Sequence, residues 1–204
     1  MRKGFIVEDV GGDMERKVGD RNILDKFAED FCKIVEKYVK YIVVSGFVAI
    51  SHGRKRTTED IDMIIERISF DEFEKLHNDL DNAGFECMQS SKAKDIYDYL
   101  ENGDGVRYVR KGGNFFPPEM EIKFVKDELD ELQIKTRKKI DFTGLDIWFS
   151  SIEFNVAFKE ELLKSNKDLE DARHFRIIYK DKINENLIND IKKMIIRLRL
   201  KNER

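Results

Sequence analysis

The chain has 204 residues, with 38 Lys and Arg against 41 Asp and Glu, and its formal net charge is −3. Charged residues make up 39% of it, whereas roughly 25% is typical of soluble proteins. Because the two signs nearly balance, the composition gives no overall attraction to nucleic acid or membranes. No stretch approaches the ~20 apolar residues of a membrane span, so we expect a soluble, cytoplasmic protein without membrane contact.

Two cysteines, Cys32 and Cys87, lie in unrelated contexts and form no C-x-x-C pair, so we expect both to be reduced. The length favours one sizeable domain, with or without a helical appendage.

Residues 1–20 contain a short apolar run and are expected to form an N-terminal arm or a strand. From Asp20, apolar residues recur at helical spacing behind a good N-cap residue, which predicts a helix. Alternating or continuous apolar runs then predict strands separated by helices and turns. The strands are expected at 41–44, 60–66, 85–89, 105–113, 119–125 and 145–149, and the helices at 47–52, 70–84 and 92–103.

The chain becomes helical after Phe149. Ser150, with Glu153 three residues on, is typical of a capping box at the start of a helix over 150–163. Helical periodicity continues over 167–179 and 184–201. We therefore predict an α/β (α+β) protein: a core over 21–149 with a mixed sheet flanked by helices, and a helical C-terminal region over 150–204 packed on it.

The most informative stretch is residues 43–65, VVSGFVAISHGRKRTTEDIDMII. In a strand, Asp60 and Asp62 project from the same face while Ile61 and Met63 point into the core. Two carboxylates beside an apolar run need a compensating cation, and a hard divalent ion such as Mg²⁺ suits them.

Upstream, Ser45 and Gly46 lie between a strand and a short helix, where free backbone N–H groups favour a phosphate. The cationic loop that follows offers Arg54, Lys55 and Arg56 to phosphates, and Thr57 and Thr58 add hydroxyl groups. Carboxylates for a metal combined with a phosphate cradle predict a nucleoside triphosphate site.

This stretch resembles the polymerase β-like nucleotidyltransferase superfamily, whose signature is an apolar residue, Gly, then Gly or Ser, a spacer, and D-x-[DE] between apolar residues. Ser45 stands where that signature has its first glycine, while Gly46, Asp60 and Asp62 match. The superfamily carries a third carboxylate on a neighbouring strand. The resemblance assigns Glu121 in PEMEIKFV to it, with Glu119 on the same strand face as the alternative.

The second half resembles AbiEii-type toxin nucleotidyltransferases and their relatives, which have a helical lysine followed by D-x-x-D. The matching residues are Lys159 in NVAFKEEL, and Asp168 and Asp171 in KDLEDAR. The resemblance implies that Lys159 contacts nucleotide phosphates and that Asp168 is needed for activity. Two plain readings remain open: Lys159 as a helix-surface lysine, and the two aspartates as partners in local ion pairs.

The resemblance implies a nucleotidyltransferase that moves a nucleoside monophosphate to an acceptor hydroxyl with Mg²⁺ or Mn²⁺. Asp60, Asp62 and Glu121 would hold the metal, and Glu121 would alternatively deprotonate the acceptor. The implied acceptors are a tRNA 3′ end, a protein side chain or a small molecule, and a toxin-antitoxin partner chain is implied as well. The alternative is an inactive nucleotide-binding or antitoxin-type module of the same fold.

Overall fold

The structure is a computed structural model that describes residues 23–55, 58, 60–112 and 118–201. The expected N-terminal arm over 1–20 lies outside these residues. Among the described helices, none is both long and apolar enough to cross a membrane.

The described strands form one mixed sheet in the order β1-β2-β5-β4-β3. Adjacent strands are antiparallel except for the central pair, β2 and β5, which are parallel and in register from Asp60 opposite Glu119 to Ile65 opposite Phe124. The strand bounds are Tyr41–Val44 (β1), Asp60–Ile65 (β2), Phe85–Cys87 (β3), Val106–Arg110 (β4) and Glu119–Phe124 (β5).

The two faces of the sheet are covered differently. Ile61, Met63 and Ile65 of β2 are buried in the main core, which includes the buried faces of α1, α3 and α4. Ile64, on the opposite face, belongs to a small cluster with Ile134 of α5. The helices of the N-terminal region are α1 (Ile23–Val35), α2 (Ser45–Ser51), α3 (Phe70–Asn82), α4 (Ala93–Glu101) and α5 (Glu128–Lys135).

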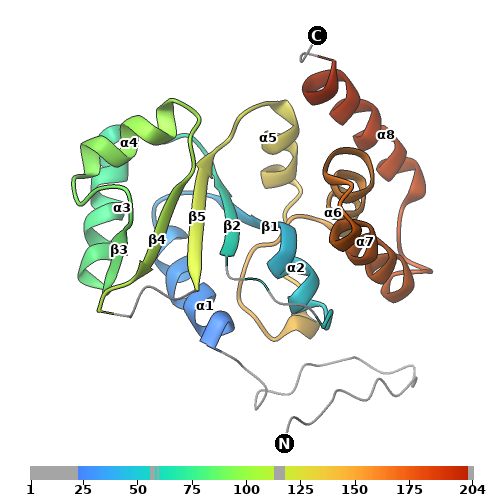
Figure 1. Ribbon diagram of the computed structural model, residues 1–204, viewed down its shortest axis with the longest axis horizontal. Helices are drawn as coiled ribbons and strands as arrows, with labels where there is room; N and C mark the ends of the chain where they lie inside the picture. Colours follow the sequence, from blue (N-terminus) through green and yellow to red (C-terminus); the bar gives the residue numbers. More distant parts are fainter. Residues whose placement is uncertain (1–22, 56–57, 59, 113–117, 202–204) are drawn as a thin grey trace, which may run out of the picture.

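The C-terminal helices gather beyond α2 and α5, on the side of the sheet where β1 lies (Figure 1). Their apolar residues, such as Phe154, Phe175 and Ile191, belong to the same core cluster as Phe31 of α1. One hydrophobic core therefore runs through both regions of the chain. These helices are α6 (Ile152–Phe158), the π-helical η3 (Lys159–Leu163), α7 (Asn166–Ile178), α8 (Glu185–Ile195) and the π-helical η4 (Ile196–Leu200), and a short 3₁₀ turn, η2 (Asp141–Thr143), precedes them.

Three sequence-based expectations need correction. Ser45 is already the first residue of α2 instead of part of a turn before it. Ser151 is the N-cap of α6, accepting a hydrogen bond from the Phe154 N–H, while the Ser150 hydroxyl donates to Gln133 Oε1, so no capping box forms at Ser150. Residues 145–149 form no strand, because only Phe149 makes isolated bridges, to Val43 and Lys138.

Candidate active site

Three carboxylates meet on the face of β2 and β5 that is turned away from the main core. One oxygen each of Asp60, Asp62 and Glu121 lie within 4.8 Å of one another. The parallel register places Glu121 directly beside Asp62, and Asp60 shares their face because it is two residues before Asp62. The structure thus brings together the three residues that the sequence assigned to metal binding.

The chemistry of this group fits a hard divalent cation. Carboxylate oxygens are the protein ligands that Mg²⁺ prefers, at about 2.0–2.1 Å, so two ligands on opposite sides of the ion lie about 4.2 Å apart. The separation of at most 4.8 Å in the structure is compatible with such a site after a small side-chain movement.

Basic side chains compensate the negative charge on one side of the group. Lys123 Nζ lies 2.6 Å from Glu121 Oε1, and Arg107 on β4 lies 3.6 Å from Glu121 Oε2. Glu119, the alternative third carboxylate, lies opposite Asp60 and has Arg107 at 3.7 Å. Among the described residues, Glu121 and not Glu119 joins the two aspartates in the carboxylate group.

Asp62 is in an environment that disfavours its charge. Burial raises the pKa of its carboxyl group, and the neighbouring Asp60 raises it further, while a contact with the Ser45 hydroxyl lowers it. Asp60 itself accepts a hydrogen bond from the Thr58 hydroxyl at 2.9 Å. A bound cation would remove the repulsion between the two aspartates.

Ser45 has φ +66°, in the left-handed region that a non-glycine residue rarely adopts. Gly46, the next residue, is buried in α2. Arg56 and Thr57, two further candidates for nucleotide binding, lie outside the described residues.

A second charged cluster consists of Lys159 at the start of η3, Asp168 and Asp171 in α7, and Arg54 in the loop after α2. The side chain of Lys159 is only 1% exposed, and its Nζ lies 3.2 Å from Asp168 and 3.0 Å from Asp171. Asp171 is fully buried and also pairs with Arg54 at 3.2 Å, while Arg54 makes a second ion pair with Glu170. Lys159 is therefore not a helix-surface lysine, and the aspartates pair with it and with the loop after α2.

Asp168 is further stabilised in its charged form. Its partial burial acts to raise the pKa, but the Ser165 hydroxyl and the charge of Lys159 lower it overall. Ser165 is also the N-cap of α7, so the same contact fixes the start of that helix.

A cavity of about 250 Å³ lies between the carboxylate face of the sheet and the C-terminal helices. Asp62, Glu121 and Lys159 all border it, so the two charged clusters open into one space. Sequence reasoning did not identify several other residues that line the cavity, among them Lys123, Gln133, Asn155, Phe158 and Arg199. The only sequence signal for them was Asn155, a polar residue inside the apolar run IEFNVAF.

Comparison with solved structures supports the fold assignment. No protein-family profile matches the chain, and no curated protein matches it in sequence. The chain is similar in structure to the antibiotic-resistance factor ANT(2'')-Ia, with a TM-score of 0.53 and 13% identity, covering 88% of this chain and 94% of that one.

A second solved structure is an antigenic nucleotidyltransferase-like protein from Paracoccidioides brasiliensis. Its TM-score is 0.49, with 13% identity over 87% of this chain and 89% of that one. The mixed sheet, the flanking helices and the similarity to ANT(2'')-Ia together show that this chain has a nucleotidyltransferase-type α+β fold.

Proposed function

We propose that this protein is a metal-dependent nucleotidyltransferase, which transfers a nucleoside monophosphate from a nucleoside triphosphate to an acceptor hydroxyl group. The observation that carries the proposal is the convergence of Asp60, Asp62 and Glu121 within 4.8 Å on a sheet of nucleotidyltransferase type. The adjoining cavity supports it, because it gives a substrate access to Asp62 and Glu121.

In the proposed reaction, the acceptor oxygen attacks the α-phosphorus, and the bond from that phosphorus to the bridging oxygen breaks to release pyrophosphate. Asp60 and Asp62 would hold Mg²⁺ or Mn²⁺, which supplies charge neutralisation and orientation of the triphosphate. Glu121 completes the ligand set or takes the proton of the acceptor hydroxyl. Its contact with Lys123 at 2.6 Å keeps it beside the cavity in either role.

Lys159 is the proposed contact for the phosphates from the helical side. It borders the cavity, and Asp168 and Asp171 hold its ammonium group in place. Phosphate oxygens would share this ammonium group with the two aspartates. In this proposal Asp168 acts by positioning Lys159.

We propose three classes of acceptor: a tRNA 3′ end, a protein side chain or a small molecule. A tRNA acceptor predicts binding that weakens steeply with salt, because phosphate contacts release counterions, whereas a small uncharged acceptor does not. A role in a toxin-antitoxin pair, with a cognate partner chain, is proposed together with the tRNA or protein acceptor.

The test is incorporation of label from each of the four α-³²P nucleoside triphosphates, with Mg²⁺, into total tRNA, cellular protein and the protein itself. We expect label in one fraction with the wild type and none with the Asp60→Ala, Asp62→Ala double variant. Equal labelling by wild type and double variant would contradict the proposal. Nucleotide binding without transfer to any fraction would favour the inactive binding module instead.

A further inference from the structure

The cavity beside the carboxylates has the size of a subsite for one ring system. Ligand pockets commonly measure about 300–1,000 Å³, and this one measures about 250 Å³. It extends from Asp62 along the sheet to Ile64, and its opposite wall is formed by α6 and η3. Such a space does not hold a whole nucleotide together with its acceptor.

The wall formed by α6 and η3 is largely apolar, and part of it is exposed to solvent. Phe154, Phe158 and Leu162 follow one another at intervals of four residues, so they lie on one face of the helix. Phe158 and Leu162 are only partly buried, and Leu163 at the same wall is 47% exposed. A wall of this kind favours a flat, largely apolar group.

The ring of Phe158 is held in a fixed environment. The guanidinium carbon of Arg199 lies 5.1 Å from its centroid, and Phe154 packs at a centroid distance of 6.4 Å. Arg199 is itself fixed by hydrogen bonds to Asp127 and Asp130. Phe158 is therefore held in place at the border of the cavity, and an aromatic ring of this kind can stack with any base through its π-face.

Asn155 adds one directed polar group to this wall. It is 4% exposed, and its Nδ2 donates to the carbonyl oxygens of Ser150 and Ser151 at 3.1 and 2.9 Å. These two acceptors fix the orientation of the amide, because an oxygen in place of the nitrogen would face both carbonyls. In the described part of the chain, Asn155 Oδ1 accepts no hydrogen bond, and the residue borders the cavity.

We propose that this cavity binds a nucleotide base with an amino group at C6 of a purine or C4 of a pyrimidine, which is adenine or cytosine. The base stacks on Phe158, and its amino group donates a hydrogen bond to Asn155 Oδ1. Guanine and uracil present a carbonyl oxygen at the corresponding position, and two facing acceptors repel each other. This inference rests on the proposed function, since it assigns the nucleotide preference of the same site.

The test is calorimetric titration with the α,β-methylene analogues of ATP, CTP, GTP and UTP, which cannot transfer their nucleotide, and with inorganic tripolyphosphate, all with Mg²⁺. We expect the wild type to bind the adenine or the cytosine analogue at least about tenfold more tightly than the two keto analogues. Asn155→Leu should abolish this preference, and the exposed control Asn189→Leu should keep it.

Phe158→Leu serves as the second variant. Because the side chain of Phe158 is partly exposed, its replacement disturbs the fold less than replacement of the buried Asn155. This variant should weaken the binding of all four analogues by about tenfold and leave tripolyphosphate binding unchanged. Equal binding of the four analogues, unaffected by Asn155→Leu and Phe158→Leu, would overturn the inference and leave the proposed function intact. Failure of every analogue and of tripolyphosphate to bind would overturn both.

Discussion

Ser45 combines an unfavourable backbone conformation with a contact to the carboxylate group. Its φ of +66° lies in a region that costs a non-glycine residue about 1–3 kcal/mol, and its hydroxyl lowers the pKa of Asp62. The superfamily signature has glycine at this position. Glycine would remove the backbone strain but also the hydroxyl group. The two effects can therefore be separated by substitution.

We expect Ser45→Gly to raise the free energy of unfolding by about 1 kcal/mol and to weaken Mn²⁺ binding by about tenfold. Lys164, with φ +55° after η3, is the matched control, because Lys164→Gly should give the same gain in stability without changing Mn²⁺ binding. Urea unfolding and a metal titration measure the two quantities. Unchanged Mn²⁺ affinity in Ser45→Gly would show that the hydroxyl has no part in the site.

Gly105, just before β4, leaves room for the side chain of Glu121 because it has no Cβ. A Cβ at this position would lie 2.3 Å from Glu121 Oε1 and 2.8 Å from Lys123 Cε. Both atoms are at the ends of flexible side chains, so they can move away at little cost. Glu121 would then leave its present position beside Asp62.

Gly105→Ala should therefore change the free energy of unfolding by no more than about 0.5 kcal/mol. It should weaken Mn²⁺ binding by about tenfold, because Glu121 moves away from the two aspartates. Gly103→Ala should show the reverse pattern, since Gly103 has φ +87° and no atom near the position of an added Cβ. The Gly103→Ala variant should lose about 1 kcal/mol of stability and keep its Mn²⁺ affinity. Identical metal binding by wild type and Gly105→Ala would argue against Glu121 as a ligand.

His52 connects the end of α2 to the C-terminal helices. Its Nδ1–H donates to the Val48 carbonyl at 2.6 Å, and its Nε2 accepts from the Tyr179 hydroxyl at 3.1 Å. Phe175 also packs on the ring, at a centroid distance of 5.3 Å. The helix predicted over 47–52 ends at His52, which is the C-cap of α2, but the contacts of His52 with α7 and Tyr179 could not be predicted from residue spacing.

This environment predicts a loss of stability in acid. Burial lowers the pKa of His52 from 6.5 to about 4, so the unfolded chain takes up a proton at a pH where the folded protein does not. Stability should fall as the pH falls from about 6.5 to 4, by up to roughly 3 kcal/mol from this group. Urea unfolding at pH 7 and 4.5 should show a smaller loss for His52→Gln, and an equal loss would contradict the assignment.

The sequence predicted elements best where a single local signal decided them. The β2 pattern and the helix over 70–84, which the structure places at Phe70–Asn82 with Gly84 at φ +84° after it, were readable because apolar periodicity and helix-stop chemistry are local. Helix α5 was not predicted, and the strand expected at 145–149 forms no strand. The conformation of 145–149 depends on contacts between distant residues, such as the hydrogen bond from Val43 N–H to the Trp148 carbonyl. Helix α5, in contrast, has local signals in its N-cap Asp127 and its acidic first turn.

For the whole molecule, the position of the C-terminal helices decides what the site can bind. The sequence indicated Asp60, Asp62 and Glu121, because a strand alternates its faces and a resemblance suggested the neighbouring strand. It did not indicate the cavity, because that space exists only once α6 and η3 pack opposite the sheet. The role of Lys159 and the boundary near residue 150 remain predictions.

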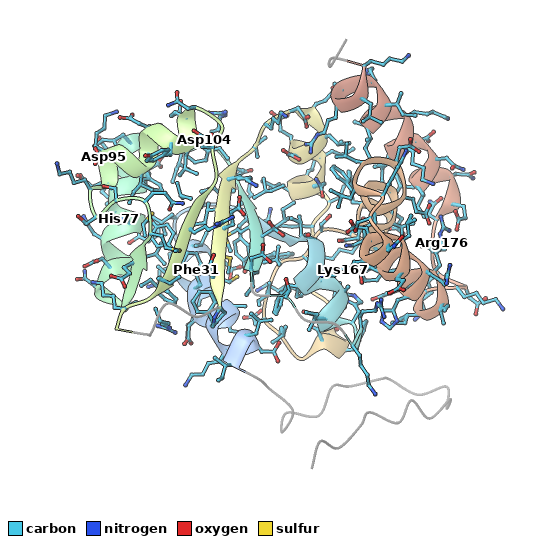
Figure 2. The ribbon with its side chains drawn as sticks, in the orientation of Figure 1. Phe31, His77, Asp95, Asp104, Lys167 and Arg176 are labelled. Atoms are coloured by element: carbon cyan, nitrogen blue, oxygen red, sulfur yellow. The ribbon has the colours of Figure 1, made fainter. Side chains whose placement is uncertain are left out.

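We propose that Asp60, Asp62 and Glu121 bind the metal of a nucleotidyl-transfer site. The most direct test is an electron paramagnetic resonance titration of free Mn²⁺ with wild type, Asp60→Asn/Asp62→Asn, and Asp95→Asn/Asp104→Asn. Asp95, in α4, and Asp104, just after it, are matched controls, because they lie across the sheet from the C-terminal helices (Figure 2). We predict that wild type and control bind one Mn²⁺ with the same affinity and that the site variant binds it at least about a hundredfold more weakly. Equal Mn²⁺ binding by all three proteins would contradict the assignment of Asp60 and Asp62 as metal ligands.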